Sequence, residues 1–234
     1  GINRFSIGIQ TFNSQLLRRS RGHTLEIATE ALSLLSDLTG NLNIDMMQDL
    51  PDHSIEDTLD DLERVASYEP AQVTWYIFRI RPEAAWFGRY QRDGLTLADT
   101  LESCRRSILI REGMKRLGYF EKTGGRFTRE PNSSDHFKEV RAGLEENLLG
   151  VGASAYSHGW GRIFRNTYSK SNYSGVSNYV DQVSKTGFAI ETGCELDETE
   201  LTASKVVSGI RRGLELPEET ASNSRYLRAA RSTL

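Results

Sequence analysis

Hydrophobic and polar positions alternate between strand-like and helix-like patterns over the first 80 residues. Three short segments, residues 4–9, 43–47 and 72–80, are apolar runs or alternations that include β-branched and aromatic side chains, as is typical of strands. Between them, apolar residues recur every three or four positions after Thr24 and again after Ser54, which predicts two helices capped by these side chains. This β-α-β-α-β order predicts parallel strands joined by right-handed crossovers.

The pattern changes after residue 82, where an α+β arrangement is expected. The predicted elements are a helix over 96–117, a hairpin around Gly124–Gly125, a glycine-rich and then strand-like segment over 148–166, a short helix over 178–185 and a last helix capped by Asp197. The sequence therefore predicts an α/β fold in two parts. We expect residues 1–82 to form half of an α/β barrel and residues 83–234 to form an α+β extension.

Composition and charge narrow the classes of function. The 234 residues are 38% hydrophobic and 26% charged with a net charge of −3, so the chain can bury a core and is not steered toward nucleic acid or an anionic membrane. No apolar run approaches the length of a membrane helix, and we expect a cytoplasmic protein. Cys104 and Cys194 are far apart and lack metal-site spacing, so no metal site is assigned.

The two ends of the sequence favour a piece of a longer protein. A strand pattern begins almost at Gly1, and residues 219–234 are polar and basic without a clear helix stop. A short natural chain with frayed termini is the alternative.

Polar side chains stand near the ends of the predicted strands, where parallel α/β sheets bind their ligands. Gln10, Asp45 and the segment after Phe78 lie at such ends. The Gln10 amide can donate and accept hydrogen bonds, Arg21 can bind a carboxylate through two parallel bonds, and Asp45 can accept two bonds from a ribose diol. A nucleotide-like ligand is one interpretation. A strand-end amide, a solvated arginine and a turn acid are the structural alternatives.

Several stretches taken together resemble one family. They are "RFSIGIQTFN", "RGH", "NIDMMQDLPDHSIEDTLDDLERVASYEPAQVTWYIF", "NLLGVGASAYS" and "RIFRN". In order and spacing they are similar to the oxygen-independent coproporphyrinogen III oxidase (HemN/HemW-like) radical S-adenosylmethionine (SAM) family. The resemblance covers residues 1 to about 215. It implies a partial (β/α)6 barrel, entered at the fourth strand and followed by an α+β extension.

The resemblance also implies a SAM site. Gln10, Arg21 and Asp45 match polar residues that hold SAM through their side chains. Arg79 matches a position whose backbone contacts SAM, and Tyr156 matches another position close to it. No catalytic residue follows from the match.

Three departures from the family pattern limit what the resemblance implies. The CxxxCxxC motif that binds a [4Fe–4S] cluster is absent, and Cys104 and Cys194 cannot replace it because a cluster open to SAM needs three neighbouring thiolates. The cluster ligands are therefore expected outside this chain, which alone would be inactive. Gln48–Asp49 replaces a usual Tyr-Gly, and residues 135–147 replace the HNxxYW motif of the heme-chaperone branch.

The resemblance implies a radical SAM enzyme when intact, and the leading interpretation is oxidative decarboxylation of the propionates of a coproporphyrinogen-type tetrapyrrole. One alternative is a methyltransferase or cyclopropanase that uses two SAM molecules on a heteroaromatic substrate. Another is a heme-binding, chaperone-like protein without catalysis, and an unrelated α/β domain is the last. The expected partners are a small-molecule substrate and an electron donor such as flavodoxin or ferredoxin.

Overall fold

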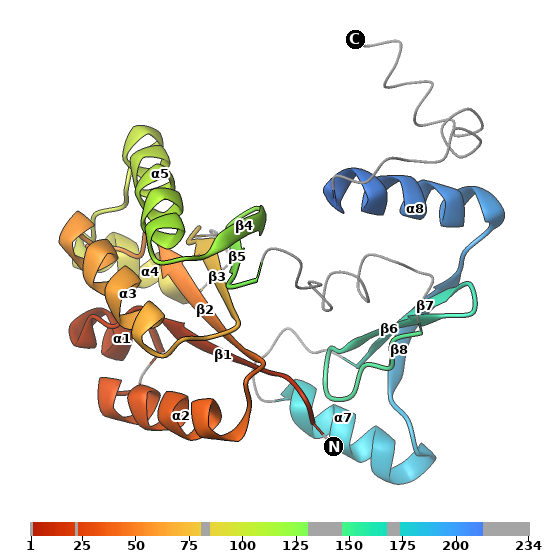
Figure 1. Cartoon of the computed structure of the whole chain (residues 1–234). Coiled ribbons are helices and arrows are strands. Elements are labelled where there is room, and N and C mark those ends of the chain that lie inside the picture. The colour runs from red at the N-terminus through yellow and green to blue at the C-terminus, as the bar shows by residue number, and fades with distance from the viewer. Residues whose placement is uncertain (1, 22, 81–84, 131–146, 168–173, 213–234) are drawn as a thin grey trace. The chain divides into compact units, whose positions relative to one another are not determined.

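The computed structural model describes residues 2–21, 23–80, 85–130, 147–167 and 174–212. The chain divides into two compact units, Gly1–Ser133 and Ser134–Leu234. Each unit is an α/β or α+β arrangement around one sheet, and each is described by itself (Figure 1). None of the helices in the described ranges is long and apolar enough to cross a membrane.

The first unit contains the alternating strands and helices that the sequence predicted. Its elements are β1 (Phe5–Gln10), α1 (Ser14–Arg21), α2 (Leu25–Leu38), β2 (Leu42–Gln48), α3 (Ile55–Ser67), β3 (Gln72–Ile77), α4 (Ala85–Asp93), α5 (Thr100–Arg116), β4 (Phe120–Thr123) and β5 (Arg126–Thr128). Strands β1, β2 and β3 are parallel neighbours, as predicted. The sheet continues through β5 to β4, both antiparallel to their neighbours, so it is a mixed five-stranded sheet.

Because the β4–β5 hairpin belongs to the first sheet, the first compact unit ends later in the sequence than the boundary expected after residue 82. The sequence predicted a boundary after residue 82, yet β5 pairs with β3, and Trp75 donates its backbone N–H to the Gly125 carbonyl at 2.7 Å. Helix α5 also packs on α3 and on β2. The compact first unit therefore extends to Ser133, because pairing between residues distant in sequence adds the hairpin to the parallel strands.

Both predicted helix starts have the expected caps. The Thr24 hydroxyl accepts a hydrogen bond from the Ile27 backbone at the start of α2. Ser54 and Asp57 form a reciprocal capping box at the start of α3, where each side chain accepts the other residue's backbone N–H. These bonds satisfy N–H groups that the first helical turn leaves without partners.

The two faces of the sheet differ sharply in polarity. One face packs against α2, α3 and α5 and forms the hydrophobic core, which includes Ile9, Ala28, Leu32, Leu42, Ile44, Met46, Leu62, Val65, Val73, Trp75, Ile110, Met114 and Phe127. Side chains alternate between faces along a strand, so the residues between these core positions point the other way. The other face, here called the polar face, carries Ser6, Gly8, Asn43, Asp45, Gln72 and Thr74.

The second unit is built around a separate antiparallel sheet. Its strands are β6 (Tyr156–Gly159), β7 (Arg162–Asn166) and β8 (Ile190–Glu195), in the order β6-β7-β8. Its described helices are α7 (Ser174–Thr186) and α8 (Glu198–Arg212), which extend the helix predicted over 178–185 and confirm the one predicted after Asp197. Over the ranges that the structure describes, the protein has an α/β fold with one mixed and one antiparallel sheet.

Candidate ligand-binding site

A hydrogen-bond network crosses the polar face, with Asn43 at its centre. The Asn43 amide nitrogen donates to Asp45 Oδ1 at 2.8 Å and to Ser6 Oγ at 2.7 Å. The Asn43 amide oxygen accepts from Thr74 Oγ1 at 3.0 Å. Ser6 in turn donates to Asp45 Oδ2 at 3.3 Å, so one oxygen of the Asp45 carboxylate is held by Asn43 of the same strand and the other by Ser6 of β1. These hydrogen bonds offset the free-energy cost of placing a partly buried carboxylate on a strand.

The network continues toward the amino-terminal ends of the strands. Gln72 donates to Thr74 at 3.3 Å and accepts from Arg4 at 3.2 Å. Asn43 is buried and Asp45 is partly exposed. The polar face is thus a preorganised set of donors and acceptors that fixes the direction of the Asp45 carboxylate.

Gln10 joins the polar face through an irregularity at the end of β1. The register between β1 and β2 slips between Gly8 and Gln10, which is a β-bulge, and Gln10 has a positive φ of 76°. The Gln10 amide folds back over Gly8, where an added Cβ would collide with its nitrogen Nε2. Gly8 is the register partner of Asp45, so Gln10 and Asp45 lie on the same face of adjacent strands.

The Gln10 amide oxygen carries unused hydrogen-bonding capacity. Gln10 is 3% exposed, and its Oε1 has no hydrogen-bond partner among the described residues. A buried carbonyl without a donor costs free energy, and a ligand that donates a hydrogen bond there would recover it. A ribose hydroxyl or an amino group fits this acceptor, and the adjacent carboxylate fits the same ligand chemistry.

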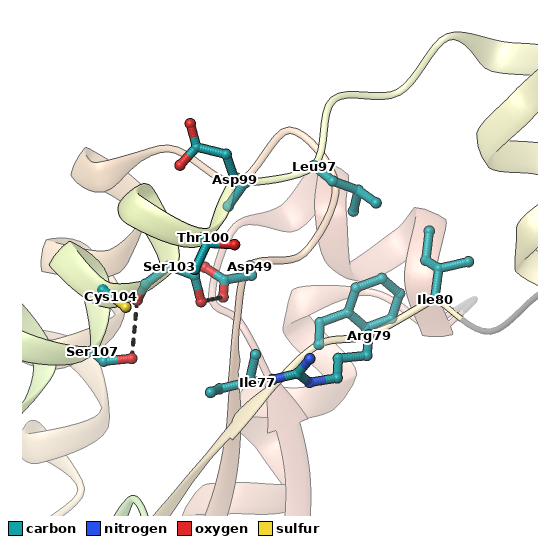
Figure 2. A pocket seen from close by; sticks show the side chains of 12 residues that line it. Asp49, Ile77, Arg79, Ile80, Leu97, Asp99, Thr100, Ser103, Cys104 and Ser107 are labelled. Carbon is teal, nitrogen blue, oxygen red and sulfur yellow. Dashed lines mark hydrogen bonds between the residues drawn. The ribbon is translucent and has the colours of Figure 1, made fainter.

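A cavity of about 490 Å³ lies at the end of β3 beside the start of α5 (Figure 2). Arg79 and the three residues Ile77, Phe78 and Ile80 line it on one side, and residues 97–100 with Ser103, Cys104 and Ser107 line it on the other. Asp49, which follows β2 with a positive φ of 63°, forms part of the wall. The cavity is therefore a second candidate binding feature, with a mixed polar and apolar lining, beside the carboxyl ends of β2 and β3.

Asp49 is tied to α5 rather than to the polar face. Its Oδ2 accepts hydrogen bonds from Ser103 at 2.5 Å and from Gln48 at 3.1 Å. Its Oδ1 lies 3.6 Å from Nη1 of Arg106, which is also buried. The guanidinium and the two hydrogen-bond donors offset the desolvation cost of the buried Asp49 carboxylate. Because Ser103 and Arg106 belong to α5, these contacts link α5 to the end of β2.

The five residues predicted from the sequence fall in different places. Gln10 and Asp45 come together on the polar face. Arg79 is exposed and lines the cavity at the end of β3. The side chain of Arg21, the last residue of α1, lies outside the described part of the structure. Tyr156 begins β6 in the second unit, with the Arg165 guanidinium 5.9 Å from its ring centre.

Sequence reasoning did not single out Asn43, Ser6 and Thr74, which build the network around Asp45. A signal for them exists in the sequence, because polar residues at 43 and 45 and again at 72 and 74 alternate with apolar ones on two neighbouring strands. Such paired alternation indicates one polar face on a sheet that is otherwise buried.

The residues of the polar face suit SAM as a ligand, but the chain lacks a set of side chains suited to a [4Fe–4S] cluster within its described residues. The Asp45 carboxylate and the free Gln10 carbonyl suit the hydroxyl and amino donors of SAM. The described residues contain no group of three His, Cys, Asp or Glu side chains that could hold a metal ion. The chain has two cysteines, Cys104 and Cys194, so it cannot by itself supply the three thiolates that a [4Fe–4S] cluster open to SAM requires.

Comparison with proteins of known sequence finds heme chaperones. The chain is 39% identical over 88 residues to the heme chaperone HemW of Buchnera aphidicola subsp. Schizaphis graminum, a match that covers 37% of this chain and 23% of that protein. It is 37% identical over 91 residues to HemW of Escherichia coli, which covers 38% of this chain and 24% of that protein. HemW of Bacillus subtilis matches at 21% identity over 214 residues, 91% of this chain and 54% of that protein.

A solved structure has the same fold. Coproporphyrinogen III oxidase (HemN) from Escherichia coli, a radical SAM enzyme, matches with a TM-score of 0.70 and 22% sequence identity, over 91% of this chain and 50% of that one. No protein-family model matches the chain. The chain spans about half the length of the relatives that it matches over most of its own length.

The fold and the polar face first define a class: an α/β protein whose sheet is covered by helices on one face and lined by polar side chains on the other. Within this class, the sequence matches are to HemW proteins and the fold matches that of HemN. The chain is therefore similar to the HemW/HemN-like radical SAM family.

Proposed function

We propose that this chain is part of a heme-chaperone-like protein that binds SAM on the polar face of its first unit. The observation that carries the heme role is the 37–39% identity with HemW heme chaperones over segments of 88 to 91 residues. The first unit then corresponds to the second half of a partial (β/α)6 barrel, and the remainder to an α+β extension. The polar face supplies the SAM-binding residues.

In this proposal Asp45 and Gln10 bind the ligand and the network beneath them holds their positions. Asp45 accepts hydrogen bonds from the ribose hydroxyls, and Gln10 accepts a hydrogen bond through its free Oε1. Arg21, Arg79 and Tyr156 remain candidate contacts on the strength of the family resemblance. SAM coordinated to a [4Fe–4S] cluster supplies radical chemistry in such proteins, and the cluster ligands come from outside this chain.

Decarboxylation of a porphyrinogen and methyl transfer are the competing functions. The likeness to HemN supports the fold, and the relatives identified by sequence are chaperones rather than oxidases. We therefore place heme carriage ahead of the two enzymatic activities. An electron donor such as flavodoxin or ferredoxin remains an expected partner for either activity.

The test uses the natural full-length protein in two titrations. Heme added to the protein should shift the Soret band and saturate at about one heme per protein, with no decarboxylated tetrapyrrole formed when coproporphyrinogen, SAM and reductant are supplied. SAM should bind the protein in calorimetry, and Asp45→Asn should weaken that binding about tenfold because a hydrogen bond to a charged group is lost.

The matched control is Asp60→Asn, which alters an exposed carboxylate on α3 that lies 3.5 Å from the Arg64 guanidinium. It should leave both titrations unchanged. Turnover of coproporphyrinogen, or transfer of a methyl group from SAM, would overturn the chaperone assignment. SAM binding that is indifferent to Asp45→Asn would overturn the proposed site.

A further inference from the structure

We infer that Asp61, a buried aspartate on α3, is a positioning residue that fixes Gln10 for its ligand. This inference rests on the proposed SAM site, because Gln10 has a ligand to receive only if that site exists. Asp61 does not touch the polar face itself. It acts on the turn that begins immediately after Gln10.

The turn after β1 is held by a carboxylate from another element. Asp61 Oδ1 accepts the backbone N–H of Phe12 at 2.5 Å and the Thr11 hydroxyl at 3.2 Å. Its Oδ2 lies 3.2 Å from Nε2 of His53. Asp61 and Thr11 are 0% exposed, so these bonds form away from solvent, where the loss of one is costly.

A second carboxylate, one helical turn earlier, holds the end of the same turn. Asp57 Oδ1 accepts from the Asn13 amide at 2.7 Å, and the Asn13 amide oxygen caps the start of α1. Residues four apart on a helix lie on the same face, so Asp57 and Asp61 present their oxygens side by side to residues 11–13. The chain leaving Gln10 is therefore fastened at successive positions to α3.

This fastening explains how Gln10 keeps an unfavourable backbone conformation. A non-glycine residue with φ of 76° occupies a sparsely populated region that persists only when its surroundings impose it. The bulge precedes Gln10 and the Asp61 bonds follow it, so the residue is constrained from both sides. The same conformation folds the Gln10 amide over Gly8 beside Asp45.

A double-mutant cycle tests the inference in the full-length protein. We expect Gln10→Ala and Asp61→Ala each to weaken SAM binding about tenfold, and the double variant to weaken it about tenfold as well, rather than about a hundredfold. Asp61→Asn, which retains one acceptor oxygen, should restore most of the lost affinity. Asp60→Ala, at the exposed neighbour of Asp61 on α3, should leave the SAM affinity unchanged both in the wild-type protein and in the Gln10→Ala variant.

The outcomes separate this inference from the proposed function. Wild-type protein that binds no SAM overturns the proposed site, whatever the variants do. If wild type binds SAM and Asp45→Asn weakens it, but Gln10→Ala and Asp61→Ala act additively, Asp61 does not work through Gln10 and the inference fails. If Asp61→Ala does not fold, Thr11→Val replaces it in the cycle, because it removes one of the two bonds on Oδ1, and the same criterion applies.

Discussion

At the residue scale, the site depends on a position that has no side chain. Gly8 leaves the space that the Gln10 amide occupies, and it lies opposite Asp45 in the parallel register. The collision that any Cβ would cause concerns the end of a flexible side chain, so the fold can survive by moving Gln10. Gly8 is therefore needed for the position of the Gln10 amide in the proposed site more than for the stability of the sheet.

Gly8→Ala should weaken SAM binding about tenfold while changing the free energy of unfolding by less than about 1 kcal/mol. The methyl group displaces the Gln10 amide from its place beside Asp45. Calorimetric titration with SAM and urea unfolding measure the two quantities separately. Gly40→Ala is the matched control, since a Cβ there meets nothing within 4 Å. Unchanged SAM affinity in Gly8→Ala would show that Gln10 takes no part in binding.

A second residue, Tyr119, makes the free energy of unfolding depend on pH in the alkaline range. Burial raises the pKa of Tyr119 to about 12, and its hydroxyl donates to the Pro70 carbonyl at 3.0 Å. Because the unfolded tyrosine ionises near pH 10, the unfolded state loses its proton first. This contribution to stability is complete below about pH 10 and is lost as the pH rises toward 12.

We expect Tyr119→Phe to remove this part of the alkaline loss. The wild-type protein should lose about 1–2 kcal/mol more than the variant between pH 9 and about pH 12, after allowing for partial solvent screening. Urea unfolding of both proteins across that range measures the difference. Parallel stability curves for the two proteins would mean that Tyr119 ionises as readily in the folded state as in the unfolded one.

At the element scale, helix α3 connects stability with the site. Its capping box fixes the first turn, and Asp57 and Asp61 then reach the end of β1 from the same helix face. Burial opposes ionisation of Asp57, but hydrogen bonds from the Ser54 backbone and the Asn13 amide outweigh it and hold its pKa below the ordinary value. The helix therefore presents a charged Asp57 at neutral pH.

Ser54→Ala should lower the free energy of unfolding by about 1 kcal/mol, because the Asp57 backbone N–H loses its acceptor. The favourable interactions of Asp57 are present above about pH 4, the ordinary carboxyl range, and are lost as the pH falls through its lowered pKa. Thermal unfolding at neutral pH measures the loss, with Ser67→Ala at the exposed end of α3 as the control. Equal stability of Ser54→Ala and wild type would contradict the role of the cap.

The sequence predicts elements well and their long-range connections less well. Periodicity and caps located β1 to β3 and the helices between them, because those signals are local. The addition of β5 to β3 and the bulge at Gln10 depend on contacts between distant residues, and neither has a local signature. For the same reason Asp45 could be singled out as a carboxylate on a strand, whereas Asp61, which holds the turn after β1 from α3, could not. Asn43 is indicated only by the alternation of polar and apolar residues along its strand.

At the scale of the whole molecule, the buried apolar residues of the described ranges are concentrated in the first unit. All members of the main hydrophobic core lie between Ile9 and Phe127. The fully or nearly buried apolar residues of the second unit, within its described part, are Ala189 and Val206. Since burial of apolar surface is the dominant stabilising term in folding, the first unit has the means to fold without the second.

Residues 1–133 produced alone should therefore unfold in one cooperative step, with a urea dependence of about 1–3 kcal/mol per molar. Circular dichroism and tryptophan fluorescence should give coincident transitions, because Trp75 lies in the core. Ile44→Val removes one methylene from a fully buried position and should cost about 0.5–1.5 kcal/mol, equally in the fragment and in the whole chain. A core that needs the second unit would give a fragment with broad, non-coincident transitions, and the Ile44→Val cost would then appear in the whole chain alone.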